Sequence, residues 1–144
     1  MRKFADIRII QCSEDCFSLN KEAFTGEFTL GTKLGIQFQY NIANRVFKTT
    51  VRVIFNKPEN IENPVLEASG SVMFELKASL IETYTVDDEI VFPTDFLEKT
   101  AQLATGTLRG IVTSHMTSEG LAPAIIPILE AEDLEMKPMV LKTK

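Results

Sequence analysis

The chain has 144 residues, of which 44% are hydrophobic and 24% are charged, so its composition lies outside the range of disordered proteins and is sufficient for a buried core. Its 20 acidic residues outnumber 15 basic residues, for a net charge of −5, which argues against a protein that neutralises nucleic-acid phosphates. No apolar run approaches the ~20 residues that span a bilayer, and the first residues lack a signal-peptide core. We therefore expect one cytoplasmic domain over residues 1–144.

Strand patterns dominate the first part of the chain. An irregular apolar stretch with Ile7, Ile9 and Ile10 precedes a polar turn at 13–15, after which Phe17 and Leu19 follow. Residues 24–30 then alternate between apolar and polar side chains, as a half-buried strand requires. These patterns predict that the fold begins with strands.

Two cysteines, Cys12 and Cys16, are the only ones in the sequence. A four-ligand zinc site would need a second pair or histidines, and the chain has neither at a suitable spacing. On a strand, the two Cα atoms would lie farther apart than the ~7 Å limit of a disulfide. We expect two reduced structural thiols and no metal.

A β-hairpin is predicted over residues 36–55. Apolar side chains alternate with Gln37, Gln39 and Asn41 in the first half, and the second half continues the alternation after a turn at 43–45. This is the pattern of two antiparallel strands that each have one wet face. The following residues 56–64 are rich in Asn, Pro and Glu and indicate an exposed loop.

A long strand is expected after this loop, reaching Leu80. Glu67, Ser69, Ser71, Glu75 and Lys77 occupy its polar face. Its apolar face carries Val72, Phe74, Leu76, Ala78 and Leu80. Gly70 lies inside the strand, which indicates a bulge or a close neighbour.

A long helix is predicted after an acidic turn at 87–89 and the segment Ile90–Pro93. Asp95 and Glu98 have the spacing of a capping box, and Gly120 marks the end. Apolar residues recur at steps of three and four: Leu97, Ala101, Ala104, Leu108, Ile111 and Val112. Such a stripe can be buried only against the sheet, whose other face is left to water or to a partner. We therefore expect an α+β fold, with an antiparallel sheet of about four or more strands under one long helix.

Gly106 and Gly110 form a G-x3-G step within this helix, and each costs about 1 kcal/mol relative to alanine. Close packing of the helix against the sheet or a second helix would compensate for that cost. A break or kink near Gly106 is the alternative. Arg109, between the two glycines, suits an ion pair or a carbonyl contact better than catalysis.

Residues for catalysis are not arranged in any familiar pattern. His115 is the only histidine, and its spacing indicates no nucleophile or carboxylate partner. The acidic clusters at 87–89 and 130–135 have the context of solvated turns and ends. Because the glycine-rich nucleotide-binding motifs are also missing, we expect no catalytic residue and no cofactor, and hence a binding protein rather than an enzyme.

The order of these elements, with LRGIVTSHMTSEG in the helix and APAIIPILEAEDL after it, resembles the SecB-like chaperones. By this resemblance Phe92-Pro93 opens the crossover and helix region, Arg109 matches the helix arginine and Gly120 matches the break after the helix. Pro127-Ile128 and Leu134 match the run that leads to a short C-terminal helix. The likeness covers most of the chain from Ile36 onward.

This resemblance implies an ATP-independent holdase that binds non-native polypeptides in apolar grooves and assembles as a tetramer, a dimer of dimers with helices at the contacts. It needs neither ATP nor metal, and an export motor of the SecA type is a further possible partner. For the client groove we select Val72, Phe74, Leu76 and Leu97, and for the oligomer contact Ala104, Leu108 and Ile111.

Three other functions stay open. The chain could be a chaperone dedicated to one partner, such as an antitoxin, or a purely structural assembly subunit. A small-ligand or acyl-thioester-binding domain would need a polar residue inside the apolar face, and we identify none on the predicted strands.

Overall fold

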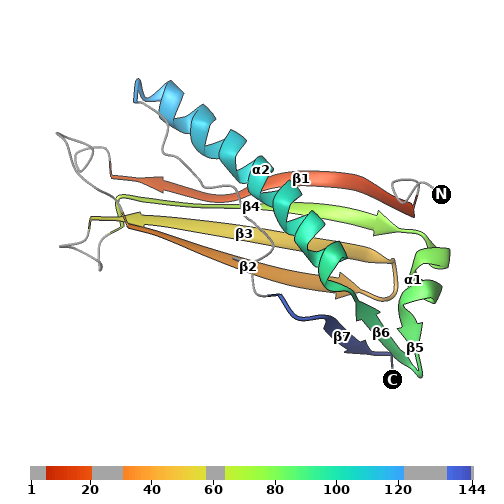
Figure 1. Cartoon of the computed structure of the whole chain (residues 1–144). Coiled ribbons are helices and arrows are strands. Elements are labelled where there is room, and N and C mark those ends of the chain that lie inside the picture. The colour runs from red at the N-terminus through yellow and green to blue at the C-terminus, as the bar shows by residue number, and fades with distance from the viewer. Residues whose placement is uncertain (1–5, 21–30, 58–63, 122–135, 144) are drawn as a thin grey trace.

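The computed structural model describes residues 6–20, 31–57, 64–121 and 136–143. Four strands form the main sheet: β1 (Ile7–Leu19), β2 (Gly31–Asn41), β3 (Val46–Asn56) and β4 (Leu66–Leu76). Their order is β1-β4-β3-β2, and every neighbouring pair is antiparallel. The helix α2 (Thr94–Ser118) crosses one face of this sheet (Figure 1). The predicted α+β architecture is therefore present.

The β2–β3 hairpin is confirmed, with Asn41 opposite Val46 at its closed end. The Asn41 side chain accepts hydrogen bonds from the backbone N–H groups of Ala43 (3.0 Å) and Asn44 (3.3 Å). Arg45 has a left-handed backbone conformation, with φ of 56°. Asparagine bonding to nearby N–H groups is a common way to fix a turn, and here it sets the register of both strands.

Strand β1 is one edge of the sheet and pairs with β4 along its whole length, with irregularities between Ile9 and Gln11 and between Glu14 and Cys16. The polar turn predicted at 13–15 is wrong, because the strand continues through these residues. An extra residue in one strand lets pairing resume after a local shift. The strand predicted at 24–30 falls outside the described residues.

The apolar stripe of α2 lies on β3 and β4, as predicted. Leu97, Ala101, Ala104, Leu108 and Val112 are buried, and Ile111 is half-buried. They face the apolar residues of the two central strands: Phe47, Val51, Val53, Phe55, Leu66, Ala68, Val72, Phe74 and Leu76. The helix and sheet therefore share one core.

The end of α2 is set by Gly120, which has φ of 73°. The Gly120 N–H donates to the Thr117 carbonyl at 3.0 Å, and the Leu121 N–H donates to the Met116 carbonyl at 2.9 Å. This pair of bonds is the Schellman motif, in which glycine takes the left-handed position at little steric cost. The predicted stop at Gly120 is confirmed.

The start of α2 differs from the prediction, because Pro93 is the N-cap residue and no side chain caps the helix there. Asp95 lies inside the first turn, where its carboxylate accepts from the Phe96 N–H at 2.9 Å. A negative charge in the first turn interacts favourably with the helix dipole. The capping box expected from Asp95 and Glu98 is therefore not the cap used.

Glycines mark where the helix touches the sheet and where it does not. A Cβ on Gly70 would lie 2.9 Å from Ile111 Cδ1, the end of a flexible side chain, and 3.9 Å from the Leu108 Cα. The helix therefore packs closely on the strand at this glycine, and a larger residue would require the end of the Ile111 side chain to move. Gly106 and Gly110 are exposed, and apart from the helix's own adjacent backbone no atom of the described residues lies within 4 Å of such a Cβ. The helix runs unbroken through both, which removes the alternative of a break at Gly106 and places these glycines on its outer face.

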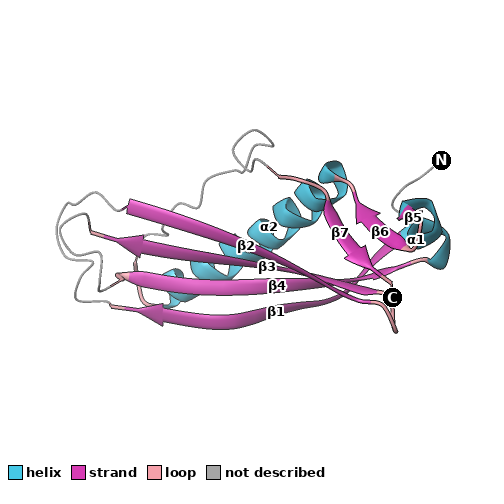
Figure 2. Ribbon diagram, turned by 90° about the horizontal axis from the view of Figure 1, so that it is seen from below, coloured by secondary structure: helices cyan, strands magenta, loops and turns pink. Residues whose placement is uncertain are grey.

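The long strand predicted to reach Leu80 ends at Leu76. A short helix, α1 (Ala78–Tyr84), follows it, so Ala78 and Leu80 are helical. A second, three-stranded sheet comes next, with β5 (Thr85–Val86), β6 (Glu89–Phe92) and β7 (Met139–Lys142) in the order β5-β6-β7. Figure 2 shows it beside α1 and the start of α2.

The turn between β5 and β6 is the acidic turn expected at 87–89. Asp87 and Asp88 both have positive φ, 48° and 64°, which is the geometry of a two-residue hairpin turn of type I′. The short C-terminal helix expected after Leu134 is absent from the described residues 136–143. Pro127, Ile128 and Leu134 themselves fall outside the described residues. Beyond them the chain forms β7, which the sequence pattern did not indicate.

Candidate functional site

A cluster of aromatic rings lies where the two sheets meet the start of α2. Phe96 contacts the rings of Phe47, Phe92 and Tyr84 at centroid distances of 4.9, 5.5 and 5.7 Å. Tyr40 joins through Phe92 at 5.1 Å. These separations are those of stacked and edge-to-face pairs, which add to the stability gained by burial. The cluster forms a rigid apolar wall.

A cavity of about 560 Å³ opens beside this wall. Its apolar lining comes from three elements: Ile7 of β1, Leu80 and Tyr84 of α1, and Phe96 at the start of α2, next to Pro93. Ile7, Leu80 and Tyr84 are half-buried. Because these side chains keep exposed apolar surface around an open volume, the cavity can take up an apolar side chain from outside.

Charged residues surround the mouth of this cavity. Asp6, Asp95 and Lys99 belong to its lining, and the last two are exposed. The pKa of the Tyr84 hydroxyl is raised above its ordinary value of 10.0, first by burial and then by the negative charges of Asp95 and Asp6. The phenol therefore stays neutral at physiological pH and can donate a hydrogen bond at the rim.

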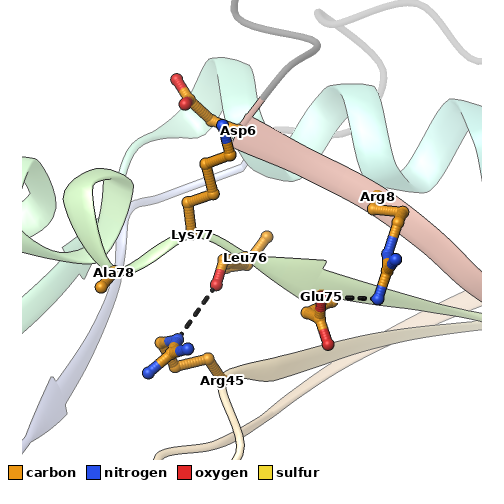
Figure 3. Close-up of a pocket in the computed structure, with 7 residues that line it drawn as sticks. All are labelled: Asp6, Arg8, Arg45, Glu75, Leu76, Lys77 and Ala78. Atoms are coloured by element: carbon orange, nitrogen blue, oxygen red, sulfur yellow. Dashed lines mark hydrogen bonds and ion pairs between the residues drawn. The ribbon is translucent and has the colours of Figure 1, made fainter.

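A second cavity of about 280 Å³ has a more polar lining (Figure 3). Arg8 and Glu75 form an ion pair across it at 2.8 Å, and Arg45 Nε donates to the Leu76 carbonyl oxygen at 3.3 Å. Asp6 lines both cavities. The smaller cavity is thus a polar neighbour of the apolar one, and its exposed ion pair contributes little to stability.

The residues selected from the sequence for the client groove are core residues. Val72, Phe74 and Leu76 on β4 are 1%, 0% and 1% exposed, and Leu97 on α2 is 2% exposed. None of them lines the 560 Å³ cavity, although Leu76 lines the smaller one. They belong to the core and offer almost no surface to a ligand in this structure.

The residues selected for the oligomer contact also face the sheet. Ala104 and Leu108 are 0% exposed, and the side chain of Ile111 points at Gly70. A contact between copies through α2 would therefore have to use its opposite face. That face carries Gly106, Gly110 and the side chain of Leu103, which is 44% exposed.

One polar pair does lie inside the apolar face, where the sequence analysis identified none. The Thr49 hydroxyl on β3 donates to the Thr100 hydroxyl on α2 at 3.0 Å, and Thr100 donates to the Leu97 carbonyl at 2.9 Å. Both threonines are buried and each hydroxyl has a partner. The pair joins the sheet to the helix and leaves no free polar group for a small ligand.

His115 is half-buried, and its ring stacks on Phe17 with centroids 3.9 Å apart. Its Nε2 atom contacts the Glu14 carboxylate of β1. The histidine therefore connects the end of α2 to the edge strand. Cys12 and Cys16 are free and exposed thiols. None of these residues lines the 560 Å³ cavity.

The sequence analysis missed Ile7, Leu80, Tyr84 and Phe96 as neighbours around one cavity. For the α1 residues a signal was present, since Leu80, Ile81 and Tyr84 have the spacing of one helical face. It was hidden because Ala78 and Leu80 also continue the alternation of β4. No comparable local signal places Ile7, some 70 residues earlier, beside them.

Comparison with known proteins identifies the fold. No family model matches the chain, and no curated protein matches it in sequence. The structure of the Mycobacterium tuberculosis SecB-like chaperone Rv1957, in complex with a ChAD peptide from the Rv1956 HigA1 antitoxin, is similar to it, with a TM-score of 0.55 and 13% sequence identity. The match covers 88% of this chain and 90% of that chain, so the chain has a SecB-like fold.

Within the described residues, neither helix combines the length and apolarity that a membrane crossing requires.

Proposed function

We propose that this chain is an ATP-independent chaperone that holds non-native polypeptides, and that the 560 Å³ cavity receives their apolar side chains. The observation that carries this proposal is the open apolar cavity between β1, α1 and α2 in a SecB-like fold. Its volume lies in the range of about 300–1,000 Å³ that is common for ligand sites. An unfolded segment supplies the apolar side chains that such a site binds.

The chemistry required is binding alone. Apolar contact with Tyr84, Phe96 and Leu80 is not specific for one sequence, which suits clients that share only exposed hydrophobic residues. A protein that binds the unfolded state shifts the equilibrium away from folding and aggregation by mass action. We expect this activity in the cytoplasm, without nucleotide or metal.

Assembly as a tetramer is part of the proposal. Several modest sites on one assembly can engage one client chain and gain avidity. The outer face of α2, with Leu103, Gly106 and Gly110, supports a contact between copies, because small residues let two helices approach closely. This face replaces the buried residues selected from the sequence.

Leu80→Asp tests the cavity. Leu80 is half-buried in α1, a helix without fully buried residues, so the substitution places a charge in the apolar lining without putting it inside the core. We expect binding of a fluorescently labelled unfolded polypeptide to weaken about tenfold, which corresponds to about 1.4 kcal/mol. The matched control is Ile42→Asp, at an apolar residue that is 48% exposed and outside the cavity lining.

Equal binding by the wild type, Leu80→Asp and Ile42→Asp would show that the cavity is not the client site. No binding by the wild type would contradict the chaperone function itself. Equal melting temperatures of the three proteins would exclude unfolding as the cause of a loss of binding.

A chaperone dedicated to one partner is the second candidate. It is supported by the antitoxin peptide in the similar structure, since that SecB-like chaperone was solved with a peptide of one specific protein. A pull-down from the source cell should then recover one dominant protein rather than many clients. Recovery of a SecA-type motor instead would favour a role in export.

A further inference from the structure

The second sheet contains a feature that the cavity does not explain. Its last strand, β7, pairs with β6 on one side and is the outer strand of the order β5-β6-β7. The pairing joins four residues on each strand, with Phe92 opposite Met139, Ile90 opposite Leu141 and Glu89 opposite Lys142. Figure 1 shows β7 beside β6 and below β2.

The side chains of β7 alternate in their burial. Met139 and Leu141 are half-buried and pack against the core, whereas Val140 and Lys142 are exposed. The β6 residues opposite Leu141 and Met139 are Ile90 and Phe92, which are 2% and 0% exposed. On the buried face of this sheet, β6 therefore has two apolar side chains, and β7 places two apolar side chains of its own beside them.

The edge of β6 that pairs with β7 adjoins the proposed client cavity. Phe92 contacts the rings of Tyr84 and Phe96 at 5.9 and 5.5 Å, and those two residues line the cavity. An extended chain on β6 would thus continue the apolar surface that begins in the cavity. Backbone hydrogen bonds to a strand edge are available to any sequence, and alternate side chains then select among sequences.

We propose that the edge of β6 is the strand-pairing half of the client site, and that β7 occupies it as an intramolecular substitute that a client segment displaces. This inference rests on the proposed function. The occupant is an extended polypeptide whose chemistry β7 itself displays: apolar side chains at alternate positions and a basic residue opposite Glu89. A basic residue there would match the favourable cross-strand pair that Glu89 and Lys142 can form.

A client segment can displace β7 because this strand has only 4 residues and pairs with one neighbour, β6. Beyond the ladder, it is held by Thr143, whose N–H and hydroxyl both donate to the Asp88 carbonyl at 2.9 and 2.7 Å. The apparent affinity for a client falls in proportion to the fraction of molecules in which β7 leaves the edge free. Holding or releasing β7 should therefore change client binding in opposite directions.

A reversible disulfide between β6 and β7 tests this directly. Val91 and Val140 are directly opposite and lie on the face away from the buried Ile90 and Phe92. Opposed Cα atoms in antiparallel strands are about 4.5–5.5 Å apart, within the range of a disulfide. The variant Val91→Cys/Val140→Cys is made in a Cys12→Ser/Cys16→Ser background, so that only one disulfide can form within the chain.

Two probes are measured by fluorescence anisotropy: a labelled peptide MKPMVLKT, which is the sequence of residues 136–143, and reduced, carboxymethylated α-lactalbumin. We expect the reduced protein to bind both probes and the oxidised protein to lose the peptide and to bind the polypeptide at least about tenfold more weakly. Equal binding by both forms would overturn the inference while leaving the proposed function intact. If neither form nor the wild type binds the polypeptide, both fail.

A release variant gives an independent result that does not depend on the disulfide. Leu141→Thr removes apolar packing of β7 but keeps a residue that suits strands, and Val140→Thr makes a comparable change at an exposed position. We expect Leu141→Thr to bind the peptide at least about threefold more tightly than Val140→Thr. Equal or weaker binding by Leu141→Thr would overturn the inference.

Discussion

At the scale of single residues, two buried threonines join the main sheet to α2. Thr100→Val should cost more stability than Thr49→Val, because it leaves the buried Thr49 hydroxyl without an acceptor. Thr49→Val leaves Thr100 bonded to the Leu97 carbonyl. We expect losses of about 1–3 kcal/mol for Thr100→Val and about 1 kcal/mol or less for Thr49→Val in urea unfolding. The reverse order would contradict the hydrogen-bond directions assigned here.

Tyr84 gives a prediction about alkaline pH. Its folded pKa is raised above the ordinary value of 10.0 by burial, Asp95 and Asp6, so the unfolded chain loses this proton first. The stability it contributes is present below pH 10 and is lost as pH rises from there through the folded pKa. Tyr84→Phe keeps the ring and removes this ionisation.

The midpoint of alkaline unfolding, followed by circular dichroism, should therefore shift to higher pH in Tyr84→Phe. The matched control is the same comparison at pH 7, where Tyr84 is neutral in both the folded and the unfolded chain. At that pH, removal of the ionisable hydroxyl should give no gain in stability from this ionisation. An unchanged alkaline midpoint would show that Tyr84 ionises alike in the folded and unfolded chains.

At the scale of elements, the contact between α2 and β4 is tested at Gly70. Gly70→Ala would place a Cβ 2.9 Å from Ile111 Cδ1, and because the end of this side chain can move, the cost should lie toward the low end of the about 1–3 kcal/mol for crowding a core. Ile111→Val removes that terminal carbon. We expect Gly70→Ala to destabilise the wild type and to cost clearly less in the Ile111→Val background.

Thermal unfolding of the four proteins in this double-mutant cycle gives the coupling between the two positions. Gly35→Ala serves as the control, because a Cβ there meets no atom of the described residues within 4 Å. Additive effects of Gly70→Ala and Ile111→Val would mean that the helix does not approach the strand at this point.

The elements that the sequence predicted well are those with long, regular periodicity. The alternation over residues 36–55 and the stripe from Leu97 to Val112 each extend over many residues, so burial on one face determines their conformation. The boundary at Leu76 was missed because an apolar residue at position 80 fits both a strand and a helix. Strand β7 was missed because four residues carry too little pattern.

The candidate site was less predictable than the fold. The sequence analysis chose apolar residues on the predicted faces, and burial turned out to be most complete there: Phe74 is 0% exposed. A binding surface instead forms where apolar residues are incompletely covered, at the junction of β1, α1 and α2. Local periodicity does not reveal such a junction, because its residues are distant in sequence.

At the scale of the whole molecule, the proposed oligomer predicts that one double variant changes two quantities in opposite directions: it stabilises the protomer and weakens the association between copies. Gly106→Ala/Gly110→Ala adds two methyl groups for which the protomer has room, and each replacement should favour the helix by up to about 1 kcal/mol. If a second α2 packs on this face, the same methyl groups should weaken the association.

Sedimentation velocity should therefore show more dissociation of the double variant than of the wild type, while urea unfolding of the dissociated chain shows equal or greater stability. A tetramer that persists unchanged in Gly106→Ala/Gly110→Ala would move the contact to another surface. Leu103→Ser on the same face gives a second variant with no change in the glycines.

The most direct test of the chaperone function is light scattering during dilution of a guanidinium-denatured enzyme that aggregates in buffer. The account predicts that the wild-type protein suppresses scattering near a stoichiometric ratio without added nucleotide, and that Leu80→Asp suppresses it less than Ile42→Asp does. Unchanged aggregation in a large excess of the wild-type protein would contradict the account.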